Sequence, residues 1–261
     1  MPGELERLTS PSAIPEKIAS GFGFTNGPVF SRRGHLLFSD TAASRIMKWE
    51  AGEVTVFREN RNSSRGLTFD HQGRLLACEQ GRVTRTEKDG KITVLADKLH
   101  APNDLVYAID GSIYFCDAAP EPGRSAIYQI TRQNNTRIVS RDCERPMGVA
   151  LAPNQQKLYA ADAGGRKLWV YAIAADGALT GGRALAESRA SGRKTDEMGN
   201  IWATESHAII VFEAQGRRLG EIPLAEDPSN CTWGDGFRNL YVTAQTSVYR
   251  IETKVNGTRT Y

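Results

Sequence analysis

The sequence lacks the short motifs that mark several common classes of enzyme. It contains no GxSxG run of the kind that forms a serine nucleophile elbow, no phosphate-binding P-loop and no GxGxxG dinucleotide motif. Its cysteines form no CxxC pair, which argues against a zinc ribbon or a dithiol redox centre, and its histidines lack the spacing of metal ligands. The cysteines and histidines, scattered along the chain, are Cys78, Cys116, Cys143, Cys231, His35, His71, His100 and His207.

Long apolar runs and clusters of one charge are missing as well. No stretch approaches the roughly 20 apolar residues of a membrane-spanning helix, and the N-terminal segment shows no apolar core of a signal peptide. The 33 basic and 30 acidic residues are mixed, with a net charge of +3 and no basic stripe, so neither a nucleic acid nor a membrane is expected as a partner. Cys78 and Cys116 lie in apolar runs typical of reduced, buried thiols. These features favour a cytoplasmic location.

What the sequence does contain is one unit repeated six times. In each unit a second apolar run ends 14 residues after the unit begins, or 15 residues after in the fourth unit. The units start 38 to 44 residues apart, and their short β-branched and aromatic runs are separated by Gly, Asp and Asn turns. This pattern predicts one all-β domain over residues 1–261, a six-bladed β-propeller with four-stranded blades. The blades begin near Asn26, Arg65, Asn103, Met147, Ser191 and Asn230.

The ends of this chain have separate roles in the predicted ring. The last repeat has only three strands before Glu252, so the segment Glu16–Gly21 is expected to supply the missing outer strand and close the ring. The polar stretch after Thr253 is expected to fray.

Two rings of side chains are expected at one mouth of the central channel, because first strands start there and second strands return there. The inner ring is formed by the six residues that begin the blades. The second ring is mostly acidic, and its members either cap backbone N–H groups or reach a ligand. It consists of Asp40, Glu79, Asp117, Asp162 and Glu205.

Several segments carry a resemblance to a known family. FTNGPVF, APNDLVYAIDGSIYF, RPMGVALAP and NCTWGDG resemble the SMP-30/gluconolactonase/luciferin-regenerating-enzyme family, and the likeness runs from about Gly21 to Glu252. The resemblance implies a six-bladed propeller that hydrolyses lactones, typically sugar-acid lactones, or related esters. It also implies one divalent cation at the channel mouth, usually calcium, with zinc, manganese or iron as alternatives. In the family this cation is held by a Glu in an FTEGPVW-like run, an Asn in RPNG and an Asp in PDGMKVD.

Matched position by position, the metal ligands of the family are replaced in this chain. The Glu position is Asn26, the Asn position is Met147 and the Asp position is Ser191. Calcium prefers charged oxygen ligands, so the loss of both carboxylates and the gain of a thioether argue against a calcium site, and we assign no metal ligand. The family's second Asn survives as Asn103, followed by Asp104. An Asn expected in the second repeat is Arg65.

The remaining residues predict a pocket for a small, anionic molecule. Arg65 can bind a carboxylate or phosphate through two parallel hydrogen bonds, or stabilise an oxyanion; alternatively it pairs with a second-ring acid and plugs the channel. We name Arg65, Asn103, Glu79, Asp117 and Asp162 as candidate catalytic residues, the three acids as general acid or base. The candidate substrate-binding residues are Asn26, Asp104, Met147, Ser191 and Asn230.

Three functions remain open at this point. The first is a lactone or ester hydrolase with an altered or lost metal site. The second is a metal-independent enzyme that cyclises or isomerises a metabolite, and the third is a propeller that binds a small anion without catalysis. The oligomeric state is left open.

Overall fold

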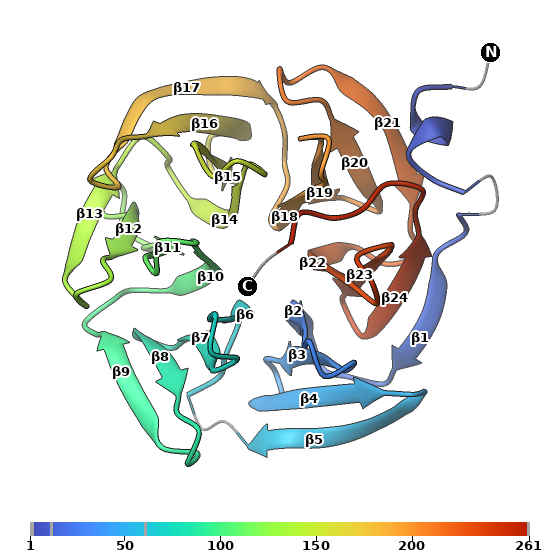
Figure 1. Ribbon diagram of the computed structural model, residues 1–261, viewed down its shortest axis with the longest axis horizontal. Coiled ribbons are helices and arrows are strands. Elements are labelled where there is room, and N and C mark those ends of the chain that lie inside the picture. Colours follow the sequence, from blue (N-terminus) through green and yellow to red (C-terminus); the bar gives the residue numbers. More distant parts are fainter. Residues whose placement is uncertain (1–2, 11–12, 60–61, 260–261) are drawn as a thin grey trace.

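Short β-patterned runs form six four-stranded antiparallel sheets around a central axis, as Figure 1 shows for this computed structural model. The structure describes residues 3–10, 13–59 and 62–259. The six-bladed, all-β prediction is confirmed. Apart from the strands, the described residues contain one short 3-10 helix, η1 (Leu5–Arg7). None of the described residues forms a helix that is long and apolar enough to cross a membrane.

Each blade contributes one strand to each of four concentric layers. The innermost strands are β2 (Thr25–Phe30), β6 (Leu67–Phe69), β10 (Pro102–Tyr107), β14 (Pro146–Leu151), β18 (Arg193–Thr195) and β22 (Pro228–Gly234). The second strands are β3 (Leu36–Asp40), β7 (Leu75–Glu79), β11 (Ile113–Asp117), β15 (Lys157–Asp162), β19 (Ile201–Glu205) and β23 (Asn239–Ala244). The third strands are β4 (Arg45–Glu50), β8 (Arg82–Thr86), β12 (Ala126–Ile130), β16 (Lys167–Ile173), β20 (Ala208–Phe212) and β24 (Ser247–Glu252). The outermost strands are β5 (Glu53–Glu59), β9 (Ile92–Ala96), β13 (Thr136–Ser140), β17 (Leu179–Glu187), β21 (Arg218–Pro223) and β1 (Glu16–Ser20).

The sixth blade joins the two ends of the chain. Its order is β1-β24-β23-β22, and β1 pairs antiparallel with β24, with Glu16 opposite Arg250. The predicted closure of the ring by an N-terminal strand is therefore confirmed. Closure leaves no gap in the ring through which blades could separate, and it covers the outer edge of the last hairpin.

The apolar core of the described residues is divided among the gaps between neighbouring blades. Each of six buried clusters draws residues from two adjacent blades; the cluster between blades one and two, for example, joins Val29 and Leu37 to Leu67 and Leu75. Burial falls from the axis outwards, since β2 is almost wholly buried and β5 is almost wholly exposed. The blades thus stabilise each other face to face, and the channel is free to carry polar residues.

We call the end of the channel where innermost strands begin the first mouth, and the end with the hairpins to the second strands the second mouth. The C-terminal stretch, as far as residue 259, crosses the second mouth and lies beside β18 (Figure 1). It is held by a bridge between Asp196 and Gly257 and by a hydrogen bond from the Thr258 N–H to the Thr195 carbonyl, 3.0 Å long. The expectation that the stretch after Thr253 frays is therefore wrong for residues 253–259, because its backbone pairs with the fifth blade.

Candidate functional site

Glycines bring the innermost strands close together at the first mouth. A Cβ atom on Gly27 would lie 1.9 Å from the carbonyl oxygen of Arg65, and one on Gly148 would lie 2.2 Å from that of Ser191. No side chain fits at such distances, so glycine follows the ring residue in four of the six repeats. The inner-ring residues therefore converge on a narrow constriction, as their spacing predicts.

Arg65, Asn103 and Met147, from three successive blades, form a connected part of this ring. Arg65 Nη1 donates to Asn103 Oδ1 at 3.1 Å, and Asn103 Nδ2 donates to the Met147 carbonyl oxygen at 2.5 Å. Asn103 is buried, whereas Arg65 is exposed at the mouth. Among the described residues Arg65 makes no ion pair, so the interpretation in which it pairs with a second-ring acid is wrong. Its guanidinium keeps N–H groups for a ligand.

Asp104 and Asn230 link opposite blades across the channel. Asn230 Nδ2 donates to Asp104 Oδ1 at 3.2 Å, and the Val149 N–H donates to Asp104 Oδ2, also at 3.2 Å. Both side chains are almost fully buried, with 1% of each residue exposed. Burial raises the pKa of Asp104, while the nearby charge of Lys194 and the two hydrogen bonds act in the opposite direction. A carboxyl with a raised pKa, next to a polar cluster, is a common feature of acid–base sites.

The other inner-ring residues are occupied locally. Asn26 Oδ1 accepts from the N–H of Gly27 at 2.7 Å, and Ser191 Oγ donates to the Ser229 carbonyl oxygen at 2.7 Å. Met147 is partly buried and offers its carbonyl rather than its sulfur to Asn103. The structure brings Arg65, Asn103 and Met147 into one chain of contacts and Asp104 and Asn230 into another.

The second-ring acids hold backbone and arginine groups. Asp117 accepts from the N–H groups of His100 at 3.0 Å and Ala101 at 2.6 Å. Asp162 accepts from the N–H groups of Glu144 at 3.1 Å and Arg145 at 2.9 Å.

The other second-ring acids also form ion pairs or accept hydrogen bonds. Glu79 pairs with Arg58 at 2.9 Å and with Arg82 at 2.8 Å. Asp40 accepts from the N–H of Phe24 at 3.1 Å, and Glu205 accepts from Ser188 Oγ at 2.6 Å. The three aspartates therefore match the capping alternative, whereas the contacts of Glu79 and Glu205 are with side chains. The catalytic role of Glu79, Asp117 and Asp162 stays a prediction.

The donor atoms at the first mouth do not fit the divalent cation that the resemblance implies. Within the described chain, no three His, Cys, Asp or Glu side chains are grouped as metal ligands. Both polar atoms of the Asn103 amide are hydrogen-bonded, and Asn26 Oδ1 accepts from its own strand. The carboxylate of Asp104 is hydrogen-bonded to the ring residue Asn230. A hard cation requires six to eight oxygens, several of them charged, and Arg65 adds positive charge beside the ring.

Sequence reasoning missed Lys194 as a member of this region. It follows Arg193 on β18, is half-buried, and lies close enough to Asp104 to oppose the rise of that carboxyl's pKa. Its Nζ donates to the carbonyl oxygen of Arg193 at 3.1 Å. The signal was its position three residues after Ser191 on an innermost strand, where a charged residue is uncommon.

The chain is thus a six-bladed propeller with a polar cluster at the first mouth of its channel. Residues 24–246 match the model of the SMP-30/gluconolactonase/LRE-like region, and the chain belongs to this family. A gluconolactonase of Zymomonas mobilis is 25% identical over 303 aligned positions, which cover 97% of this chain and 85% of the relative.

Solved structures show the same relationship. A gluconolactonase from Xanthomonas campestris, described as important in glucose secondary metabolic pathways, is 26% identical with a TM-score of 0.89, covering 97% of this chain and 93% of the other. A luciferin-regenerating enzyme is 17% identical with a TM-score of 0.82, covering 95% of this chain and 99% of the other, and this likeness shows the fold alone.

Proposed function

We propose that this chain hydrolyses a lactone or a related ester that carries a negative charge, and that it does so without the divalent cation of its family. The observation that carries the proposal is the Arg65–Asn103 contact at the first mouth, 3.1 Å long, in a chain whose relatives include gluconolactonases. Arg65 supplies a fixed positive charge where the substitutions Asn26, Met147 and Ser191 have removed the usual ligands. The ligand is a small anionic molecule bound at this mouth.

The exposed guanidinium accounts for binding and for part of the chemistry. A guanidinium can make two parallel hydrogen bonds to a carboxylate or phosphate of the substrate. When water adds to the lactone carbonyl carbon, negative charge develops on the carbonyl oxygen, and N–H donors placed there stabilise it. The ring C–O bond then breaks, the ring oxygen takes up a proton, and a hydroxy acid is released.

Asp104 is our first candidate for the group that handles the proton of the attacking water. It lies directly after Asn103 on β10, and its pKa is raised by burial, so its proton affinity is closer to that of a working base near neutrality. Asn230 Nδ2 donates a hydrogen bond to the Oδ1 atom of Asp104. Glu79, Asp117 and Asp162 remain alternatives; like Asp104, each would have to release a hydrogen bond or ion pair to take this role.

Hydrolysis of a lactone panel, followed by proton release, tests the proposal. The panel includes lactones with and without a carboxylate or phosphate group, assayed with EDTA and separately with calcium, zinc, manganese or iron(II). We expect turnover of the charged substrates in EDTA. Arg65→Ala and Asn103→Ala should each lower kcat/KM by roughly tenfold or more, the value of a hydrogen bond to a charged group. Arg145→Ala, an exposed arginine near Met147, is the matched control and should leave kcat/KM unchanged.

The outcomes separate the parts of the proposal. No turnover of any lactone or ester under any metal condition removes the hydrolase assignment. Turnover that requires an added cation keeps the hydrolase and removes the role given to Arg65.

The four cysteines are free and buried, which supports the further proposal of a cytoplasmic location.

A further inference from the structure

A second cavity lies at the other end of the channel, away from Arg65 and Asn103. Its volume is about 550 Å³, within the range of small-molecule sites. Three hairpin turns of the sixth, first and second blades surround it, at residues 31–34, 70–73 and 234–237. We call it the second-mouth pocket.

The walls of the second-mouth pocket are aromatic and fixed in place. Phe30, Phe69, Trp233 and Phe237 line it. Phe30 stacks on Tyr241 with ring centroids 5.1 Å apart, and Trp233 Nε1 donates to the Thr195 carbonyl oxygen at 2.8 Å. These walls therefore form a stable surface for a flat apolar group.

The rim of the pocket carries positive charge. Arg32 and Arg33 are exposed, and neither makes an ion pair with a residue that the structure describes. The guanidinium of Arg259 lies 5.8 Å from the Phe237 ring centroid, which adds a third cation beside the wall.

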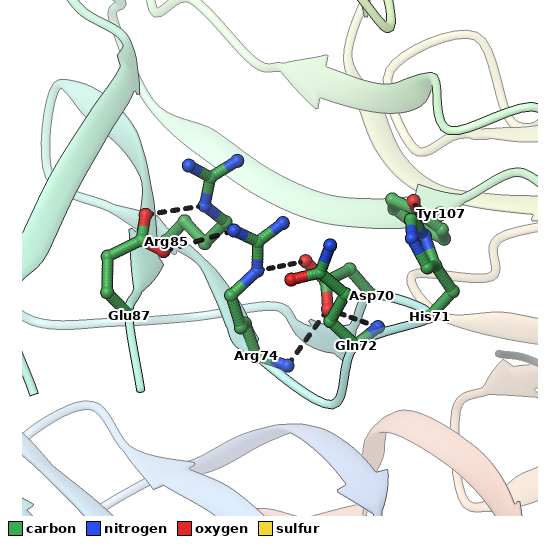
Figure 2. Close-up of polar contacts among 7 residues, drawn as sticks. All are labelled: Asp70, His71, Gln72, Arg74, Arg85, Glu87 and Tyr107. Atoms are coloured by element: carbon green, nitrogen blue, oxygen red, sulfur yellow. Dashed lines mark hydrogen bonds and ion pairs between the residues drawn. The ribbon is translucent and has the colours of Figure 1, made fainter. Parts of the chain in front are cut away.

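The pocket's carboxylates do not cancel this charge. Asp70 is buried and already receives hydrogen bonds from Arg74 Nε at 2.7 Å and from the N–H of Gln72 at 2.9 Å, as Figure 2 shows. Asp235 is exposed and accepts from Asn239 Nδ2 at 3.4 Å. Among the residues that the structure describes around the pocket, Arg32, Arg33 and Arg259 outnumber the one exposed carboxylate, Asp235, so the pocket favours a negatively charged occupant.

Figure 2 also shows how one side of the pocket is held rigid. The Asp70 carboxylate binds the turn that carries His71, and Arg74 in turn contacts Glu87 at 3.1 Å. His71 Nδ1 is hydrogen-bonded to Tyr107 Oη, which fixes the orientation of the imidazole ring. A preorganised rim lowers the entropy that a ligand loses on binding.

We propose that the second-mouth pocket binds a small aromatic carboxylate. The aromatic walls contact the ring of the ligand, and Arg32 and Arg33 bind its carboxylate. The site is independent of the proposed hydrolysis, because its residues come from the opposite ends of the innermost strands.

Titration calorimetry with four probes tests this inference: benzoate, cyclohexanecarboxylate, benzyl alcohol and inorganic phosphate. Benzoate carries both features, and each other probe lacks the aromatic ring, the charge or the apolar body. We expect benzoate to saturate the protein with a Kd of at most about 1 mM, and the other three to bind at least tenfold more weakly. Arg32→Ala/Arg33→Ala should weaken benzoate binding by roughly tenfold or more.

Two control variants locate the site. Arg124→Ala/Arg132→Ala removes two exposed arginines outside the pocket and should leave benzoate binding unchanged. Asn103→Ala alters the first mouth and should also have no effect. The inference is overturned by the absence of saturable benzoate binding, by equal binding of cyclohexanecarboxylate, benzyl alcohol or phosphate, or by loss of binding in either control variant.

Discussion

Replacing Arg193 by Met should make the protein more stable. Arg193 begins β18, none of its surface is exposed, and none of its three guanidinium nitrogens has a hydrogen-bond partner in the described structure. Its side chain lies on the face of the fifth blade that packs against the fourth, because Thr195 on the same face donates to the Leu151 carbonyl oxygen at 2.7 Å. A buried cation without a partner is among the costlier features that a fold can contain.

The size of the effect follows from the burial of the charge. Desolvation lowers the pKa of Arg193 to about 10, although Cys116, Cys143 and Asp104 oppose this change. At about 1.36 kcal/mol for each pH unit below the ordinary value, the penalty near neutral pH is about 3 kcal/mol, and it is relieved only as the pH rises above 10. Methionine fills a similar volume without a charge, and replacements of this kind stabilise by about 1–4 kcal/mol. For a chain of this size the melting temperature should rise by roughly 2–8 °C.

Urea unfolding and calorimetry of Arg193→Met measure this change directly. Arg193→Lys keeps a buried charge on a shorter side chain and should be no more stable than the original protein. Arg124→Met, at an exposed position, should change the free energy of unfolding by less than about 0.5 kcal/mol. A loss of more than about 1 kcal/mol in Arg193→Met would refute the reasoning, since it would mean that the guanidinium is neutralised by a group such as a trapped water or anion.

Two further predictions concern the C-terminal stretch and the partly exposed Glu226 carboxylate. Gly257→Ala should lower the free energy of unfolding by about 1–3 kcal/mol in urea, because its Cβ would lie 1.8 Å from Trp233 Cγ. Gly3→Ala should have no effect, because its Cβ would meet Glu6 Cδ at an ordinary contact distance of 3.9 Å. Burial opposes ionisation of Glu226, but hydrogen bonds lower its pKa to about 2. The ionised Glu226 carboxylate therefore stabilises the fold above about pH 4.5, and this contribution is lost as the pH falls towards 2. Glu226→Gln should make the free energy of unfolding depend less on pH in this range. The donors are Ser247, Lys17, Thr246 and Tyr249.

The fold was predictable because its signal is local and repeated. Each blade can be recognised from its own run of about forty residues, and six copies at nearly constant spacing leave little freedom in the count. Even the pairing of Glu16–Ser20 with β24 follows from the missing outer strand of the last repeat. The tail was mispredicted since its contacts, such as Gly257 against Trp233, depend on shape rather than on pattern.

The site was predictable in position but not in its contacts. The spacing of the repeats placed Arg65, Asn103 and Asn230 at one mouth, yet it gave no information about which of them touch. The Asp104–Asn230 hydrogen bond joins residues 126 positions apart on opposite blades, and the partner of Arg65 is a neighbouring amide rather than an acid. Such contacts depend on the width of the channel, which the glycines of the innermost strands set by their close approach.

Residues that recur in most blades and residues that break the repeat serve different purposes in this protein. The acids at the ends of the second strands recur, and they hold backbone N–H groups or arginines, as Asp117 and Glu79 do. After the inner-ring residue, glycine is the rule, and Asp104 replaces it with a carboxylate that reaches across the axis. Natural sequences depart from local rules chiefly at functional or strained positions. Arg65 and Asp104 are departures of this kind at the same mouth, and for that reason we place the chemistry on them rather than on the recurring acids.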